Sequence, residues 1–311
     1  MRILFTVLST VFLSALTFAT SDSVLQSKIQ TMAAQHHGKV ALFATNLKSG
    51  DTVAIDADTP VATASVIKLP ILLEAMLEVK AGKHKLADKI TLQKDDVVQA
   101  SGVLQFFDTP LIITFKDALT FMIIESDNTA TNLVIDTVGI KNVNERMQQI
   151  ALKDTYLYKK VFKPATGPMP ADQKKFGLGK TTAREMARVM ESIVRCELKD
   201  QTLCDSMLYM LRNQQYRNLV PHYIETSDTS EGLSLIANKT GSLDAVRNDV
   251  AVVYSKNGPI IISAFTYDNE DQRWNNENGA ELLVARMARI IMEAWSPQGL
   301  AKEIPRATSL P

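Results

Sequence analysis

Several features that identify common protein classes are missing from this chain of 311 residues. It carries 34 Lys and Arg against 34 Asp and Glu, and this zero net charge gives no sign of a nucleic-acid partner. It has no Gly-x-Ser-x-Gly turn and no His-Glu-x-x-His pair, so a Ser-His-Asp hydrolase and a metallo-enzyme are both disfavoured. Beyond the first residues, no apolar run is long enough to span a bilayer. We therefore expect no metal ion, no cofactor and a small ligand.

The chain is also poor in cysteine, with Cys196 and Cys204 as the only two. Neither is near a pair of histidines, which argues against a zinc site. They lie at the predicted junction of two helices, where a local disulfide would form in an oxidising compartment. The alternative is a pair of buried thiols that act as small apolar side chains. The sequence leaves both open.

The N-terminus has one positive charge at Arg2 and then an apolar stretch that ends near Ala19. This pattern predicts a secretory signal peptide over residues 1–19. A membrane anchor is the alternative, but serines and threonines interrupt the stretch, and it is shorter than the ~20 apolar residues of a span. We expect an exported protein, periplasmic or secreted, that keeps no stable membrane span after cleavage and is a monomer.

Strand patterns lie near both ends of the chain, and a long helical stretch separates them. The elements expected near the ends are a helix over Ser23 to Gln35, strands over Lys39 to Thr45 and Thr52 to Ile55, a hairpin of Val250 to Tyr254 with Ile260 to Tyr267, and a helix over Ala280 to Trp295. This segregation predicts an α+β fold with two lobes. One antiparallel sheet is built from both chain ends and has flanking helices, and an all-α lobe is inserted between them.

The expected domain covers residues 20–296. Its sheet lobe comprises about 23–64 and 213–296, and its helical lobe about 65–212. A cleft between two lobes is a natural place for a ligand. The tail 297–311 has three prolines and no periodicity, which predicts disorder.

The first motif with chemical meaning is Ser65-Val66-Ile67-Lys68, which opens an apolar run typical of a buried helix. Residues three apart rise on one face of a helix, so Ser65 and Lys68 lie together. A serine hydroxyl is a weak nucleophile until a neighbour takes its proton, and a neutral Lys68 can do so. The alternative makes Ser65 a helix cap and Lys68 a solvent-facing side chain. This alternative would be preferred if the motif stood alone.

Two further motifs follow in order, Ser126-Asp127-Asn128 and Lys239-Thr240-Gly241. Ser126 is placed to pass a proton to a leaving nitrogen, Asn128 to hold a substrate amide, and Asp127 to brace the loop. The alternative for this motif is an ordinary capped helix start.

Lys239-Thr240-Gly241-Ser242 precedes a strand, and alternate side chains of a strand share one face, so Lys239 and Gly241 face the cleft together. Lys239 is also the second cation that would favour a neutral Lys68. A glycine there allows a substrate backbone to approach, and the amides of Ser65 and Ser242 form a candidate oxyanion hole. Arg247 is a candidate fork for a substrate carboxylate, and a surface ion pair is its alternative.

These motifs, in this order and at this spacing, resemble the class A β-lactamases and the penicillin-binding serine enzymes. The resemblance covers nearly the whole chain after the signal peptide. It implies a catalytic set of Ser65, Lys68, Ser126 and Lys239, and a substrate-binding set of Asn128, Thr240, Gly241, Ser242 and Arg247. It also implies an acyl-enzyme on Ser65 and a β-lactam or cell-wall peptide as the substrate.

The chain departs from this family in the loop from Tyr156 to Lys180, where a class A enzyme has a Glu and an Asn that position the hydrolytic water. Neither residue is present, and Asp172 is the only carboxylate of the loop. We expect Asp172 to be a solvated charge rather than a base. Hydrolysis of a β-lactam amide is then slow. The alternatives are a D-Ala-type cell-wall peptidase, a penicillin-binding sensor that does not hydrolyse, a glutaminase-type amidase and a non-catalytic binding module.

Overall fold

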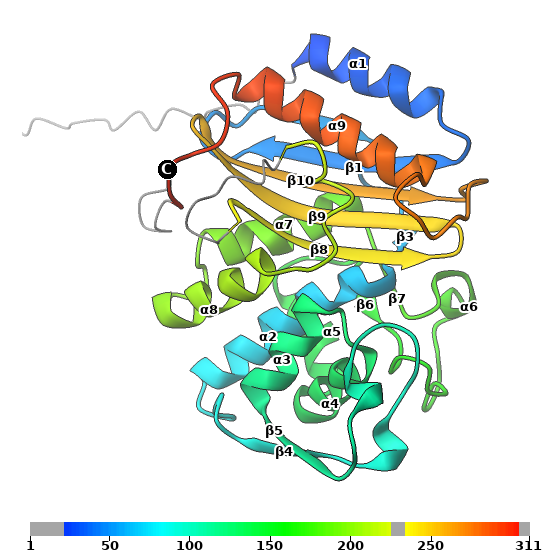
Figure 1. Cartoon of the computed structure of the whole chain (residues 1–311), viewed down its shortest axis with the longest axis vertical. Coiled ribbons are helices and arrows are strands. Elements are labelled where there is room, and N and C mark those ends of the chain that lie inside the picture. Colours follow the sequence, from blue (N-terminus) through cyan, green and yellow to red (C-terminus); the bar gives the residue numbers. More distant parts are fainter. Residues whose placement is uncertain (1–21, 225–233, 305–311) are drawn as a thin grey trace, which may run out of the picture.

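The structure is a computed structural model that describes residues 22–224 and 234–304, so the predicted signal peptide lies outside the described residues. Its largest sheet has five antiparallel strands in the order β2-β1-β10-β9-β8 (Figure 1). Their bounds are β1 Lys39–Asn46, β2 Thr52–Ile55, β8 Ile236–Leu243, β9 Val246–Ser255 and β10 Gly258–Tyr267. Two strands come from the start of the chain and three from its end. The predicted α+β fold with a sheet from both chain ends is confirmed.

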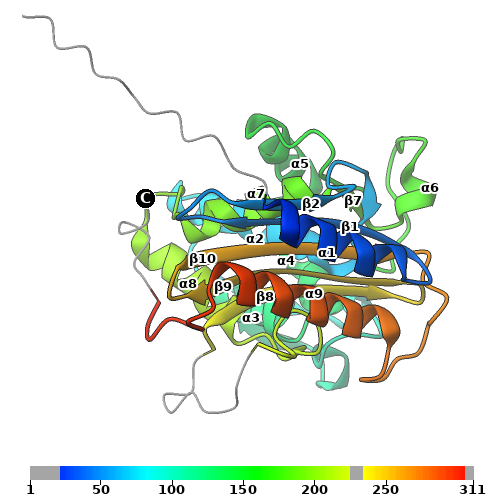
Figure 2. The same ribbon diagram turned by 90° about the horizontal axis from the view of Figure 1, so that it is seen from above.

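Two helices from opposite ends of the chain, α1 (Ser23–Ala34) and α9 (Gly279–Trp295), lie side by side across one face of the sheet (Figure 2). They pack there because side chains alternate between the two faces of a strand. Leu42 and Ala44 of β1 join the core under these helices, whereas Ala41 belongs to the core on the other face. Both helices agree with the predicted ones to within one residue.

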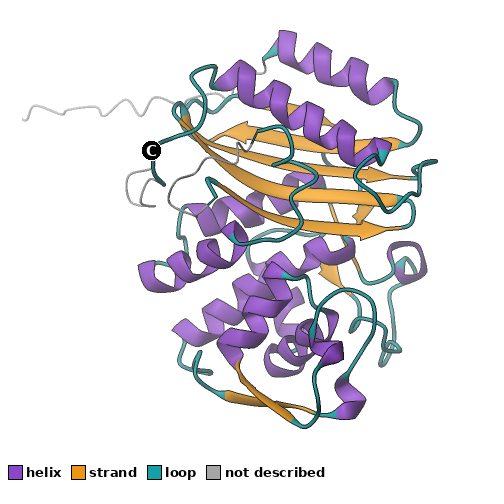
Figure 3. Cartoon of the chain, viewed as in Figure 1, coloured by secondary structure: helices purple, strands orange, loops and turns teal. Residues whose placement is uncertain are grey.

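The remaining long helices lie on the other side of the sheet (Figure 3). They are α2 Lys68–Lys80, α3 Phe115–Ile124, α4 Asn128–Val138, α5 Ile140–Gln149, α7 Ala183–Val194 and α8 Gln201–Arg212. Apolar side chains of α2, α3, α4 and α7 share one core with the sheet residues Ala41, Val250 and Phe265. The helical part and the sheet are therefore fixed against each other by one continuous core.

Short elements complete the helical side. A three-stranded sheet has the order β3-β7-β6, and a two-stranded sheet pairs β4 with β5. Their bounds are β3 Val61–Ala62, β4 Lys89–Leu92, β5 Leu111–Thr114, β6 Tyr156–Leu157 and β7 Gly179–Thr181. One short helix, α6 (Gln173–Phe176), and three 3₁₀ turns, η1 Ala64–Ile67, η2 Lys94–Asp96 and η3 Leu104–Phe106, lie between them. β3 leads directly into η1, so the small sheet anchors the turn that holds Ser65.

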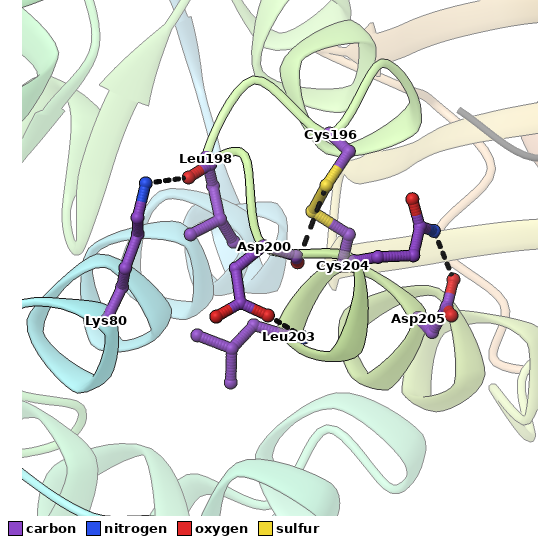
Figure 4. The surroundings of a disulfide bond; sticks show 8 residues. Lys80, Cys196, Leu198, Asp200, Leu203, Cys204 and Asp205 are labelled. Carbon is purple, nitrogen blue, oxygen red and sulfur yellow. Dashed lines mark hydrogen bonds between the residues drawn. A yellow bond between two sulfur atoms is a disulfide. The ribbon is translucent and has the colours of Figure 1, made fainter. Parts of the chain in front are cut away.

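The two cysteines form a disulfide that ties the end of α7 to α8 (Figure 4). Of the two possibilities that the sequence leaves open, the structure has the disulfide. The Lys80 ammonium, at the end of α2, donates a hydrogen bond to the carbonyl oxygen of Leu198 in the same link. The cross-link therefore fixes a segment that also holds the C-terminal end of α2.

The expected disorder of the tail does not hold for residues 297–304. Leu300 forms a bridge with Ser255, and the amide of Ala301 donates to the carbonyl oxygen of Tyr254 at 2.9 Å. The tail follows this path because the end of β9 offers it backbone hydrogen-bonding groups. Residues 305–311 lie outside the described residues. No helix among residues 22–224 and 234–304 has the length and apolar character of a membrane span.

Candidate active site

Ser65 lies in η1, a tight turn rather than the regular helix that the sequence predicts, and α2 begins only at Lys68. Ala64 has a φ of +45°, in the left-handed region that costs a non-glycine residue energy. The side-chain amide of Asn248 on β9 donates to the carbonyl oxygens of Ala62 (3.0 Å) and Thr63 (3.3 Å). The strained turn is thus held in place by the main sheet.

Gly241 on β8 packs directly against this turn. A Cβ atom at Gly241 would lie 2.8 Å from the amide nitrogens of Ser65 and Val66 and from the carbonyl oxygen of Thr63. Backbone atoms at that distance cannot give way as the end of a flexible side chain can. The glycine is therefore needed for close packing against the Ser65 turn, a role that the sequence does not indicate, and Gly241 also lines the pocket described below.

Lys68 is completely buried at the start of α2. Its ammonium group donates to the Ser126 carbonyl oxygen (2.6 Å), the Ser126 hydroxyl (3.1 Å) and the Asn128 side-chain oxygen (3.1 Å). Burial and then the positive charge of Lys239 lower the pKa of Lys68 well below its usual value of 10.5. This shift is in the direction of the neutral amine that a general base requires.

Ser126 lies between the two lysines. Its hydroxyl is 3.1 Å from the nitrogen of Lys68 and accepts a hydrogen bond from Lys239 at 3.0 Å. Ser126 has a φ of +52°, a second strained position in the site. Asp127 supports this conformation, because its carboxylate accepts from the amides of Ala130 (2.8 Å) and Leu104 (2.8 Å). The predicted bracing by Asp127 agrees with these contacts.

Lys239 is fully buried on β8 and also donates to the carbonyl oxygen of Thr240 at 2.7 Å. Burial lowers the pKa of Lys239 to about 7. Asp249, fully buried on the neighbouring strand, has a pKa raised by burial to about 6. Two buried groups with opposite charge and shifted pKa values therefore lie directly behind the site.

A pocket of about 750 Å³ opens beside Ser65. Its lining includes the predicted residues Ser65, Ser126, Asn128, Thr240, Gly241 and Ser242. Lys68 and Lys239 are buried behind these lining residues. Each contacts the lining through a hydrogen bond to the Ser126 hydroxyl. The Ser65 hydroxyl itself makes no hydrogen bond to any described residue, and the Lys68 ammonium bonds to Ser126 and Asn128 instead. Ser65 and Lys68 are joined only through the backbone, where the Lys68 amide donates to the Ser65 carbonyl oxygen. The Asn128 amide nitrogen is directed to the carbonyl oxygen of Gln99 at 3.3 Å.

Arg247 is not available for a substrate carboxylate, and that expectation is wrong. Its guanidinium is completely buried and lies 3.1 Å from the carboxylate of Glu281. It donates to the carbonyl oxygens of Leu243, Val246 (2.9 Å) and Arg273 (2.8 Å). It is not the alternative surface ion pair either, because both Arg247 and Glu281 are buried. The strand pattern correctly predicts its position but carries no information on the loop and helix that cover it.

The loop between β6 and β7 forms the opposite wall of the pocket. Val161 lines the pocket, and its backbone is fixed by the Asn132 side chain through bonds of 2.8 and 3.0 Å. Asp172, the only carboxylate of the loop, accepts from the Tyr158 hydroxyl (2.8 Å) and pairs with Lys180 (2.8 Å). These two partners lower the pKa of Asp172, which makes it a poorer base. Asp172 is ion-paired rather than simply solvated.

Three residues that shape the pocket belong to none of the sequence motifs. Asn248 and Asn132 are buried amides that hold the turn and the loop, and Trp274 contributes an exposed ring to the pocket. A polar residue inside an apolar helix or strand is the only available signal for Asn132 and Asn248. Among the described ranges, no group of three or more His, Cys, Asp and Glu side chains could hold a metal ion.

Known proteins of one family resemble this chain along most of its length. The model of a family described as "Beta-lactamase enzyme family" matches residues 24–295, which is most of the chain. The chain belongs to this family. The predicted membership of the β-lactamase and penicillin-binding superfamily is therefore confirmed, and it supports a β-lactamase-like hydrolase with a small-molecule substrate.

Within this β-lactamase family, the sequence is 24% identical to β-lactamase 3 of Bacillus cereus over 264 residues, 83% of this chain and 78% of that protein. A solved β-lactamase of Sphaerobacter thermophilus is 27% identical, with a TM-score of 0.75 over 86% of this chain and 96% of that one. The solved structure of a PBP-A mutant, an acyl-enzyme complex with penicillin G, is 25% identical with a TM-score of 0.76, over 88% and 97%.

Proposed function

We propose that this protein is a serine acyl-enzyme of the β-lactamase family that opens β-lactam amide bonds through Ser65 and releases the product slowly. The hydrogen-bonded chain from Lys68 through Ser126 to Lys239, adjacent to the Ser65 turn, carries this proposal. The predicted signal sequence supports action outside the cytoplasm, in the periplasm or after secretion.

Acylation uses groups that the site already brings together. The Ser65 oxygen attacks the carbonyl carbon of the lactam, and its proton moves to the neutral amine of Lys68. The amides of Ser65 and Ser242 are placed to stabilise the negative oxygen that forms. When the carbon–nitrogen bond breaks, the Ser126 hydroxyl gives a proton to the leaving nitrogen and regains one from a neighbouring lysine. The net result is an ester on Ser65 and an opened ring.

Deacylation requires a water molecule and a base to activate it. A class A enzyme has a Glu for this task, whereas the loop here presents Val161 and an ion-paired Asp172. Lys68 is the remaining base for this step. Loss of one general base typically slows a step about 10²–10⁴-fold. The ester on Ser65 is therefore expected to persist.

The same observation favours a second candidate, a penicillin-binding peptidase or sensor. A D-Ala-type peptide presents an amide bond to the same constellation, and a slowly released penicillin would block it. PBP-A shares the fold, and a mutant of it forms an acyl-enzyme complex with penicillin G. A long-lived adduct is common to both candidates, and the rate of penicillin consumption separates them.

The test is the intact mass of the chain without residues 1–19, followed over time after mixing with excess penicillin. We expect a mass increase of one penicillin that lasts for hours and is absent in Ser65→Ala. A short-lived adduct with rapid consumption of penicillin would show an efficient β-lactamase and contradict the slow release. An adduct that also forms on Ser65→Ala, or no adduct and no consumption with the native chain, would exclude an acyl-enzyme on Ser65.

A further inference from the structure

Trp274 is an exposed aromatic residue at the pocket. It lies in the link between β10 and α9, lines the pocket, and is 65% exposed. Most large aromatic side chains bury much of their surface, since the ring contributes 150–250 Å² of contact. An open ring on the wall of a ligand pocket is therefore available for contact with the ligand.

One face of the ring is already supported. The buried guanidinium of Arg247 lies 4.3 Å from the centre of the Trp274 ring, in a cation–π arrangement. Arg247 is itself held by Glu281, as described above. The ring thus rests on a fixed cation and offers its other face outward.

The link that carries Trp274 is also fixed. Arg247 donates to the carbonyl oxygen of Arg273 at 2.8 Å, and the buried side chain of Asn278 donates to the same oxygen at 2.8 Å. The Arg273 guanidinium is paired with Asp271 at 2.8 Å. A ring held in this way needs little ordering when a ligand binds, which favours affinity.

Polar groups next to the ring identify the kind of ligand. Asn275 and Asn276 follow Trp274 in the pocket lining, and Asp244 also lines the pocket, where its carbonyl oxygen accepts from Arg247 at 3.3 Å. The Asn275 amide nitrogen, the Asn276 side chain and the Asp244 carboxylate make no hydrogen bonds within residues 22–224 and 234–304. These groups supply donors and acceptors beside an apolar face. A pyranose ring matches both, because its C–H face stacks on an indole while its hydroxyl and acetamido groups point outward in the ring plane.

We propose that Trp274, with Asn275, Asn276 and Asp244, forms a subsite for an N-acetylated sugar ring. A phenyl side chain would use the indole face but leave the two amides and the carboxylate without partners, so it fits less well. The subsite shares the pocket with Ser65. This extends the proposed function without depending on it, since sugar binding requires no acylation.

The test is titration of the chain without residues 1–19 with chitotriose, three linked N-acetylglucosamine units. The chain has two tryptophans, and Trp295 is buried. We expect a saturable change in tryptophan fluorescence that is lost in Trp274→Phe, because Trp295 lies outside the pocket lining. Ligand-observed NMR then gives the affinities, and Trp274→Ala should lower the association constant at least about tenfold. Trp274→Phe, which keeps an aromatic face, should lose less.

Tyr209→Ala is the matched control, because it removes an exposed ring of α8 that is not part of the pocket, and it should bind chitotriose like the native chain. Circular dichroism confirms the fold of each variant. No binding up to the solubility limit of the sugar, or equal affinity in Trp274→Ala, would overturn the subsite. Ser65→Ala should lose the penicillin adduct and still bind chitotriose, so the subsite and the acyl-enzyme are tested separately.

Discussion

The two walls of the pocket differ in the chemistry that they can support. On one side, Lys68, Ser126 and Lys239 form a buried hydrogen-bonded chain behind Ser65. On the other side, the loop between β6 and β7 presents Val161 and keeps its only carboxylate, Asp172, in a salt bridge. The first wall has the groups that the proposed acylation requires, and the second has no unpaired carboxylate for the proposed hydrolysis of the ester.

In the proposed mechanism, the two half-reactions would therefore depend on separate parts of the fold. The acylation wall is built from β8, η1 and the start of α4, which are fixed by the shared core and by Asn248. The opposite wall is a single loop, attached through Asn132 to α4. Changes in that loop can therefore alter the fate of the ester while the nucleophile stays in place. The following changes test this separation.

Replacement of Lys68 by Met should have the largest effect. The variant removes the proposed base and the three hydrogen bonds to Ser126 and Asn128, so we expect acylation to slow by about 10²–10⁴-fold. The measurement is the rate of penicillin adduct formation by rapid-quench mass spectrometry. Lys160→Met is the control, because it removes a pocket lysine that is paired with Asp136 instead. Comparable rates in Lys68→Met and the native chain would mean that another group takes the proton.

Replacement of Val161 by Glu should supply the missing base. The Val161 backbone is fixed by Asn132 and its side chain lines the pocket with Ser65, so a carboxylate there can reach the ester. We expect release of the penicilloyl group to accelerate at least about tenfold, with little change in adduct formation. The measurement is the decay of the adduct mass after excess penicillin is removed.

Val161→Gln is the matched control, since it has the length of Glu without a charge. It should leave the adduct as persistent as in the native chain. Equal acceleration by Gln and Glu would attribute the effect to water entry and not to a base. A persistent adduct in Val161→Glu would show that the missing carboxylate does not by itself explain the slow release of the penicilloyl group.

Much of the fold could be predicted from the sequence, because its signals are local. The strand expected over Lys39 to Thr45 and the hairpin expected from Val250 to Tyr254 with Ile260 to Tyr267 each lie near an observed element. The predicted disorder of the tail does not hold for residues 297–304, since Ala301 pairs with a strand end far away in sequence. Such a long-range backbone pairing leaves no pattern in the tail itself.

The candidate site could be predicted only for groups that carry their own motif. Ser65, Ser126 and Lys239 are brought together as the motif spacing implies, whereas Arg247 is covered by Glu281 and by the link that carries Trp274. Whether a polar side chain faces a ligand or other protein groups depends on what packs over it, and periodicity does not report this. The sequence also gives no sign that Gly241 packs against the Ser65 turn, because that turn lies more than a hundred residues away in sequence.

Replacement of Lys239 by Gln should change the pH dependence of acylation. The positive charge of Lys239 helps to lower the pKa of Lys68, so its removal raises that pKa. The base form of Lys68 then appears at higher pH, and the rise of the acylation rate with pH moves in the alkaline direction. Lys160→Gln, a change of equal charge in the pocket, should leave the profile in place. An unshifted profile in Lys239→Gln would exclude this electrostatic coupling.

The smallest effect is expected for Asp172→Asn, which tests whether the opposite wall contains a base after all. The Asp172 carboxylate is held by Tyr158 and Lys180, and these bonds lower its pKa and keep it from taking a proton from water. Adduct decay should therefore stay within about twofold of the native rate, since loss of a general base costs far more. Asp136→Asn, which removes the partner of Lys160 next to the same loop, is the control for a general loosening of this wall. If Asp172→Asn alone slowed the decay tenfold or more, Asp172 would be the base, and the contrast between the two walls would fail.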